Sequence, residues 1–308
     1  PPPAGAEALM RGFLERVAEN NDMRGRAAAQ DFVPLVVPGA AATPVGYVPA
    51  ELAETFAAFD DVFERDNDGA LVMRPALDTM EARSEAMADV TASLRERGLA
   101  PGWRDELVVV AEAFDAAPAF LIERACLAMV GARGYGVHIN GWTSNPETGE
   151  TMLWVATRAK TKPTWPGMLD HLVAGQQPYG LSPMENVVKE CYEEAGVDGA
   201  LAAEARPVGA VSYDVVNEKD QLKRDALFCF DLELPWGWEP RAMDGEVEAF
   251  ELWPLDRVAN AVAGIGEAPY KPNCNLVVLD FLVRRGYITP DWPSYLRLVS
   301  SLRSATSQ

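Results

Sequence analysis

Three glutamates recur at helical spacing in the stretch from 183 to 195. Glu190, Glu193 and Glu194 are three and four residues apart, so a helix places them on one face. Carboxylates gathered in this way repel one another unless a cation lies among them. Oxygen ligands of this kind suit Mg²⁺ or Mn²⁺. A cation held in this way neutralises phosphate charge and activates water, which is the chemistry of diphosphate hydrolysis.

The helix that carries these acids has clear predicted boundaries. Ser182 is a capping residue, Pro183 suits the first helical position, and Glu185 completes a capping box. Gly196 ends the helix, and the loop that begins at Gly175 folds back in front of it. Where two adjacent acids on a helix stand alone, we interpret them as part of a solvated acidic face. The loop and hairpin that precede this helix favour a cation site instead.

The stretch from Gly175 to Val197 resembles the Nudix box, GX5EX7REUXEEXGU, in which U is an aliphatic residue. The matching positions are Gly175, Glu190, Cys191, Glu193, Glu194, Gly196 and Val197. In Nudix enzymes the box glutamates bind divalent metals. The resemblance therefore implies that Glu190 and Glu194 are direct ligands, that Glu193 is a ligand or holds water, and that Gly175 belongs to the metal site.

Two box positions differ from the pattern. Leu181 stands where the box has its first glutamate, and Lys189 stands where it has arginine. In the family that pair orients the metal-binding glutamate, and the loss of both together favours a co-adapted variant. Glu185 lies four residues before Lys189 and can pair with it on the helix. The departures also motivate an alternative, a Nudix protein that binds a ligand without cleaving it.

Longer segments resemble one branch of Nudix proteins, which comprises the domain fused to thiamin pyrophosphokinase in some fungi and stand-alone plant, yeast and bacterial relatives. These segments are YGVHINGW, WPGMLDHLVAG, FDLELP, DGEVEAFELWPL and YKPNCNLVVLDFLVRRG. The branch implies removal of one phosphate from thiamin diphosphate, with a preference for oxidised oxo and oxy forms. ADP-ribose, CoA and nucleoside triphosphates stay open as substrates, and isomerase chemistry lacks an evident reactive cysteine.

Residues outside the box are candidates for the same site. Glu246 and Glu248 share a strand face after the Asp244-Gly245 turn, and we favour Glu246 as the further ligand or general base. Aromatic rings and cations could bind the substrate's ring and diphosphate. The candidates are Trp142, Trp165, Tyr179, Tyr213, Lys160, Lys162 and Arg224. We expect His138 and Asn140 to be structural, and Cys191 to lie in the core.

The expected fold is an α/β/α Nudix sandwich with a mixed sheet, preceded by a mainly helical N-terminal domain. We place the helical domain at 1–125, the Nudix domain at 126–299 and a frayed tail at 300–308. In the first domain, helices are expected over 105–114 and from Pro118 onward. In the second, we expect a hairpin of 135–140 with 151–157, strands at 208–214, 226–234 and 247–253, and helices at 183–195, 256–263 and 275–285. The front domain is expected to close over the substrate or to form a homodimer.

Composition restricts the partners. The chain has 27 Lys and Arg against 46 Asp and Glu, a formal charge of −19 over 308 residues. Such a chain is unsuited to bare nucleic acid or an anionic membrane, so a cation must mediate any contact with phosphate. Four dispersed cysteines indicate a reduced, cytoplasmic protein. Without a CxxC pair, and with only His138 and His171, we expect no zinc site.

Overall fold

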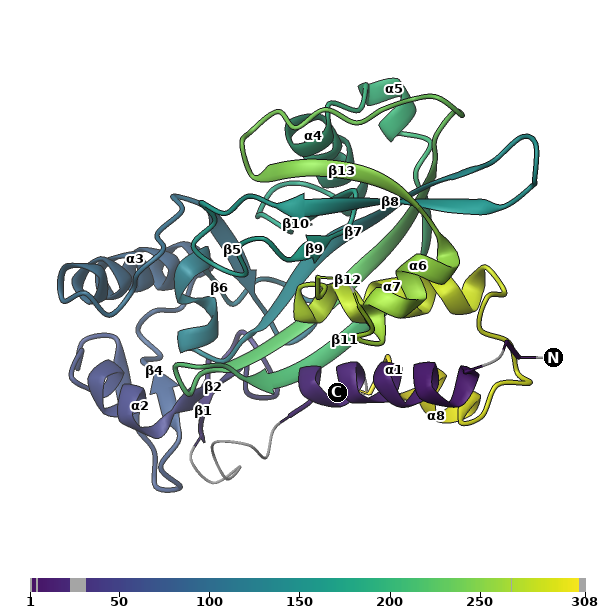
Figure 1. Ribbon diagram of the computed structural model, residues 1–308. Helices are drawn as coiled ribbons and strands as arrows, with labels where there is room; N and C mark the ends of the chain where they lie inside the picture. Colours follow the sequence, from purple (N-terminus) through teal and green to yellow (C-terminus); the bar gives the residue numbers. More distant parts are fainter. Residues whose placement is uncertain (1, 4, 23–31, 267, 305–308) are drawn as a thin grey trace.

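The computed structural model describes residues 2–3, 5–22, 32–266 and 268–304 (Figure 1). A mixed sheet forms its centre, with strand order β11-β12-β7-β8-β13. The five strands are β7 (Arg133–Ser144), β8 (Thr151–Arg158), β11 (Arg206–Val216), β12 (Leu222–Glu233) and β13 (Val247–Pro254). β12 runs parallel to β7, and the other neighbours are antiparallel. The predicted hairpin is β7 with β8.

β7 and β8 pair only near their shared turn and then diverge. Beyond that point β10 (Val173–Gln176) pairs with β7, and β9 (Leu169–Asp170) pairs with β8. The two short strands therefore fill the gap between the long ones. This arrangement brings the loop from Gly175 beside β7, directly before the helix that carries the acids.

Helices cover both faces of the sheet (Figure 1). One face carries α4 (Pro183–Ala195) and α5 (Gly199–Ala202), and the bounds of α4 are those predicted. The opposite face carries α6 (Leu255–Val262), α7 (Pro272–Arg284), α8 (Tyr295–Ser301) and α1 (Ala6–Asn20). The predicted α/β sandwich with a mixed sheet is confirmed.

The front part of the chain contains more sheet than predicted. Its helices are α2 (Ala50–Ala57), α3 (Met80–Glu96) and the 3₁₀ helix η2 (Arg124–Met129). Its strands are β1 (Phe32–Val36), β2 (Gly46–Pro49), β3 (Phe63–Arg65), β4 (Leu71–Met73), β5 (Leu107–Val110) and β6 (Phe120–Glu123). The helices predicted over 105–114 and from Pro118 are wrong, because β5 and β6 pair there as antiparallel strands. Short apolar runs do not distinguish the two structures, and three consecutive valines in β5 favour a strand.

α1 lies within the range 1–125 assigned to the front domain, yet it packs on helices of the range assigned to the Nudix domain. Phe13 of α1 is fully buried against the core of α6, α7 and α8, and its ring stacks on Trp292 with centroids 6.3 Å apart. Gly12 allows the close approach, because a Cβ there would lie 2.5 Å from the backbone oxygen of Ala263. The first helix therefore completes the layer opposite α4.

The predicted tail also begins too early. α8 runs to Ser301, and Leu302 is buried, with its backbone oxygen accepting a hydrogen bond from Ser212 N at 3.0 Å. Residues 305–308 lie outside the described part of the chain.

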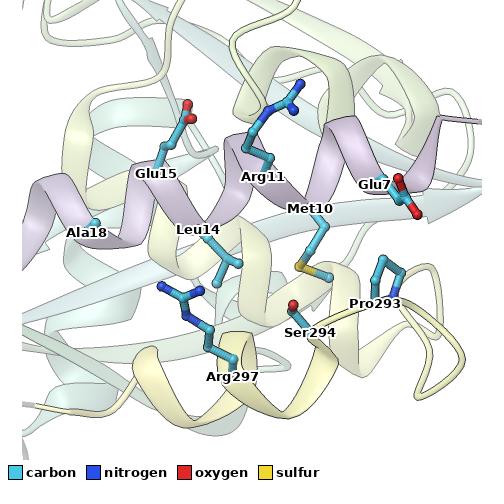
Figure 2. A pocket seen from close by; sticks show the side chains of 9 residues that line it. All are labelled: Glu7, Met10, Arg11, Leu14, Glu15, Ala18, Pro293, Ser294 and Arg297. Carbon is cyan, nitrogen blue, oxygen red and sulfur yellow. The ribbon is translucent and has the colours of Figure 1, made fainter.

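A cleft of about 400 Å³ lies between α1 and the start of α8. Figure 2 shows Met10 and Leu14 pointing from α1 toward Pro293, Ser294 and Arg297. No residue predicted for the active site lines it. Among the described helices, none is long and apolar enough to cross a membrane.

Candidate active site

The start and end of α4 follow from local chemistry. Ser182 Oγ accepts the Glu185 N–H at 3.3 Å, and Glu185 Oε2 accepts the Ser182 N–H at 2.8 Å, which completes the capping box. Gly196 ends the helix in the left-handed region, at φ 64°. These two residues fix the stretch between them as helix and so place the box acids.

The predicted pair between Glu185 and Lys189 does not form, because Glu185 is used by the cap. Lys189 Nζ instead lies 3.1 Å from Glu190 Oε1 and 2.8 Å from Glu193 Oε2. The lysine therefore offsets part of the repulsion between the acids. Glu193 is about half exposed and lies at the outer end of this arrangement.

Glu190 packs directly over Gly175. A Cβ at Gly175 would lie 2.4 Å from Glu190 Cδ, so only glycine leaves room for this carboxylate. The Glu190 side chain is 15% exposed, and burial raises its pKa above the ordinary value despite the nearby Lys189. The opening glycine of the box thus determines where Glu190 lies.

Glu194 lies deeper, against β10. Its Oε2 accepts the Ala174 N–H at 3.0 Å. Burial raises the pKa of Glu194 well above its ordinary value, the Ala174 N–H partly offsets this, and the carboxylates of Asp170, Glu190 and Glu246 raise it further. A carboxylate in these surroundings is stabilised by a bound cation.

Carboxylates from a second element complete the site. Oxygens of Glu194, Asp244 and Glu246 all lie within 4.8 Å of one another, which joins α4 to the turn before β13. Asp244 was not among the predicted site residues. Its Oδ1 accepts the Glu246 N–H at 2.8 Å, so the residue first interpreted as part of a turn also orients Glu246. Three oxygen ligands from two elements fit a hard divalent cation.

Glu246 and Glu248 lie in different surroundings. Glu246 belongs to the cluster and contacts the Lys162 ammonium. Burial would raise the pKa of Glu246, but Lys162, with Arg104 and Arg158, outweighs burial and lowers that pKa. Glu248 pairs at 3.4 Å with Lys160, which is largely exposed. The geometry therefore favours Glu246 as the additional carboxylate.

Three of the residues predicted to bind substrate have structural partners. Trp142 lies on the face of the sheet that α7 covers. The Arg285 guanidinium carbon lies 3.5 Å from the centroid of the Trp142 ring. Tyr213 is buried and donates its hydroxyl hydrogen bond to Asp225. Tyr213 is buried and Arg285 covers a face of the Trp142 ring, so the structure gives no support to stacking of the substrate on these two rings. Arg224 pairs with Asp214 at 3.4 Å.

The remaining predicted residues lie on the surface or in the core. Trp165 and Tyr179 are 42% and 49% exposed on separate loops. Asn140 donates to Asp231 at 3.1 Å, and Cys191 is fully buried in the core under α4, both as expected.

An aromatic group beside the box loop was not predicted. Phe114, from the loop between β5 and β6, lies 4.9 Å from Tyr135 and 4.7 Å from Phe228 between ring centroids. The Tyr135 backbone oxygen accepts the Gln177 N–H at 2.8 Å, which ties this group to the loop that follows Gly175. Phe114 is 46% exposed, so a flat ring can reach it. Only the fold brings the front segment to this position.

Comparisons with known proteins give the family of the chain. A family model described as a domain of unknown function, DUF4743, matches residues 12–134. Nudix hydrolases 20 and 24, chloroplastic, of Arabidopsis thaliana are each 41% identical, covering 96% of this chain and 78% of the relative. The crystal structure of DR0079 from Deinococcus radiodurans, 21% identical, covers 60% of this chain and all of its own, with a TM-score of 0.43. The resemblance in the box is thus confirmed, and the chain belongs to the Nudix hydrolases, which hydrolyse pyrophosphate linkages in small molecules with divalent metal ions.

Proposed function

We propose that the protein removes one phosphate from thiamin diphosphate, or from its oxo and oxy forms, and releases the monophosphate. The observation that carries the reaction type is the convergence of Glu194, Asp244 and Glu246, with oxygens within 4.8 Å of one another. The resemblance of the longer segments to the thiamin-related branch supports the choice of substrate.

The carboxylates of the site would have separate roles in metal binding and proton transfer. Glu190, Glu194, Asp244 and Glu246 would hold Mg²⁺ or Mn²⁺, which supplies charge neutralisation and an activated water. Glu246 would either bind the metal or take the proton of the attacking water, and its side chain, 41% exposed, is accessible to solvent. Glu193, exposed and bound to Lys189, holds water at the rim.

The aromatic group supplies a binding surface for the organic part of the substrate. Phe114, Tyr135 and Phe228 offer faces and edges against which a pyrimidine or thiazolium ring can pack. An adenine ring fits the same chemistry, so nucleoside diphosphate derivatives belong in the test.

A substrate panel with product analysis tests the proposal. The purified protein is incubated in Mg²⁺ or Mn²⁺ with thiamin diphosphate, oxothiamin diphosphate, ADP-ribose, CoA and ATP, and phosphate release and product masses are recorded. We expect thiamin compounds to have the highest kcat/KM and to give monophosphate. Faster hydrolysis of ADP-ribose to two monophosphates would contradict the thiamin assignment and leave the metal site intact.

Variants test the site separately from the substrate. Glu190→Gln and Glu194→Gln should each lower kcat/KM by about 100-fold or more, since each removes a charge that holds the metal. Glu248→Gln is the matched control, because Glu248 lies on β13 just after Glu246 but outside the carboxylate cluster. Unchanged activity in both box variants would overturn the metal-site assignment.

A further inference from the structure

A second cluster of metal-binding side chains lies apart from the carboxylates. His138 of β7, His171 of the loop between β9 and β10, and Cys274 of α7 have ligand atoms within 4.8 Å of one another. All three are buried, with exposed fractions of 4%, 3% and 0%. The sequence separations are large, and only the packing of α7 on the sheet brings them together.

The imidazoles of this cluster lack hydrogen-bond partners. Both ring nitrogens of His171 and Nδ1 of His138 are buried, and none finds a partner within the described parts of the chain. A buried polar atom without a partner costs about 1–3 kcal/mol, so native proteins almost always satisfy such atoms. Each neutral imidazole has one nitrogen with a free lone pair, and a bound metal ion would accept one such lone pair from each ring.

The arrangement of the rings suits a metal ion. The His138 and His171 rings are nearly perpendicular, at 83°, with centroids 5.1 Å apart. Two imidazoles and a thiolate are the ligands of Zn²⁺ and similar borderline ions, whereas Mg²⁺ takes oxygen. Burial lowers the pKa of both imidazoles, whereas burial and the Asp170 carboxylate raise the pKa of the Cys274 thiol well above its ordinary value.

Asp170 provides an outer partner for the cysteine. Cys274 Sγ donates to Asp170 Oδ1 at 2.9 Å, and the His171 backbone N–H donates to the same oxygen at 2.9 Å. The other oxygen is 2.7 Å from the Arg158 guanidinium and 3.9 Å from the Lys271 ammonium. The carboxylate is thus fixed beside the thiol.

We propose that His138, His171 and Cys274 bind one Zn²⁺ ion at a structural site distinct from the catalytic carboxylates. On binding, the Cys274 S–H bond breaks, a Zn–S bond forms, and the proton leaves to solvent. Asp170 or a water takes the fourth position. From the sequence we expect no zinc site, because the chain has no CxxC pair and only two histidines. We depart from that expectation here because the fold joins residues that the sequence separates.

The metal site would stabilise the position of Glu194 on α4 through the neighbouring strand β10. His138 is the register partner of Ala174, whose N–H holds Glu194 at 3.0 Å. A metal that links β7, the β9–β10 loop and α7 would therefore fix the strand that positions Glu194. The carboxylate cluster and this site bind different metals, so they can be loaded separately.

A cobalt titration of the full chain tests the proposal. Protein freed of metal by a chelator is titrated with Co²⁺ in excess Mg²⁺, which occupies oxygen ligands. We expect a thiolate-to-Co²⁺ charge-transfer band and tetrahedral d–d bands that saturate at one equivalent and disappear when Zn²⁺ is added. Cys274→Ser should lose the charge-transfer band, and Cys229→Ser, at another buried cysteine, should keep it.

Histidine variants checked for folding distinguish a lost metal ligand from a folding defect. His138→Gln and His171→Gln should each weaken Co²⁺ binding by about 10-fold or more, with circular dichroism used to confirm that each variant is folded. Absence of the band in the wild-type protein would overturn the proposal. So would a band retained in Cys274→Ser, or unchanged Co²⁺ affinity in both folded histidine variants. Because no readout is hydrolysis, the outcome is independent of the proposed substrate.

Discussion

The lack of a side chain at Gly175 is needed for the position of Glu190. Gly175→Ala would place a Cβ 2.4 Å from Glu190 Cδ and force that carboxylate away from its position. Since a shift of about 1 Å can cost about 100-fold in rate, we expect a loss of that order in kcat/KM with little change in Tm.

Gly199→Ala is the matched control for this change, because outside its own helix and chain neighbours the nearest described atom to its new Cβ is Val188 Cγ1 at 3.7 Å. Full activity of Gly175→Ala would show that Glu190 does not need its present position.

Glu246 and Glu248 make a second test at single residues. Glu246→Gln removes a carboxylate from the cluster with Glu194 and Asp244, and should weaken activation by Mg²⁺ about 10- to 100-fold. Glu248→Gln removes only a surface pair with Lys160 and should leave activation unchanged. The Mg²⁺ concentration at half-maximal rate is the measurement, and an equal effect in both variants would contradict the assignment.

The residues that could be predicted from sequence are those whose partners are local. Glu190 and Glu194 share one helix, so spacing alone places them on one face. Asp244 joins them from a turn 50 residues later, and nothing in its own neighbourhood distinguishes it from an ordinary Asp-Gly turn. His138 and Cys274 meet only because α7 packs on β7.

Among the secondary-structure elements, α4 is the one whose formation can be tested most directly. Ser182→Ala removes the acceptor for the Glu185 N–H and should cost about 1 kcal/mol, or about 2 °C in Tm. Ser182→Thr keeps a hydroxyl cap and should melt within about 1 °C of the wild-type protein. Thermal unfolding followed by circular dichroism distinguishes them, and equal Tm values for alanine and wild type would show that the cap contributes nothing.

Helices and strands, like site residues, could be predicted from sequence where local residues determine them. The bounds of α4 were predicted because a cap, a proline and a terminal glycine mark both of its ends. β5 and β6 were predicted as helix because short apolar runs do not distinguish a helix from a strand, and the pairing of the two runs with each other makes them strands.

For the whole molecule, the buried thiols predict a dependence of stability on pH. Burial raises the pKa of Cys126 to about 11 and that of Cys229 to about 12, against 9.0 for the exposed group. Above pH 9 the unfolded chain releases these protons while the folded chain retains them. The stability from these thiols is therefore complete below about pH 9 and declines as pH rises toward 11 to 12.

Urea unfolding at a series of alkaline pH values measures this decline. The double variant Cys126→Ala with Cys229→Ala should show a shallower decline. Thiol labelling gives a second measurement, since native protein near pH 8 should react slowly and denatured protein fully. Rapid labelling of Cys126 or Cys229 in the native protein would contradict the burial on which the prediction rests.

The position of α1 could not be predicted, because its apolar stripe is compatible with any apolar surface. It packs on α7 and α8, which lie at the other end of the described chain (Figure 1). At about 5–20 residues per second, roughly 15–55 s separate the synthesis of Phe13 from that of its ring partner Trp292. During translation the apolar side of this helix has no native surface to cover it. A chaperone that binds nascent chains would therefore be expected to hold this segment until α7 and α8 emerge.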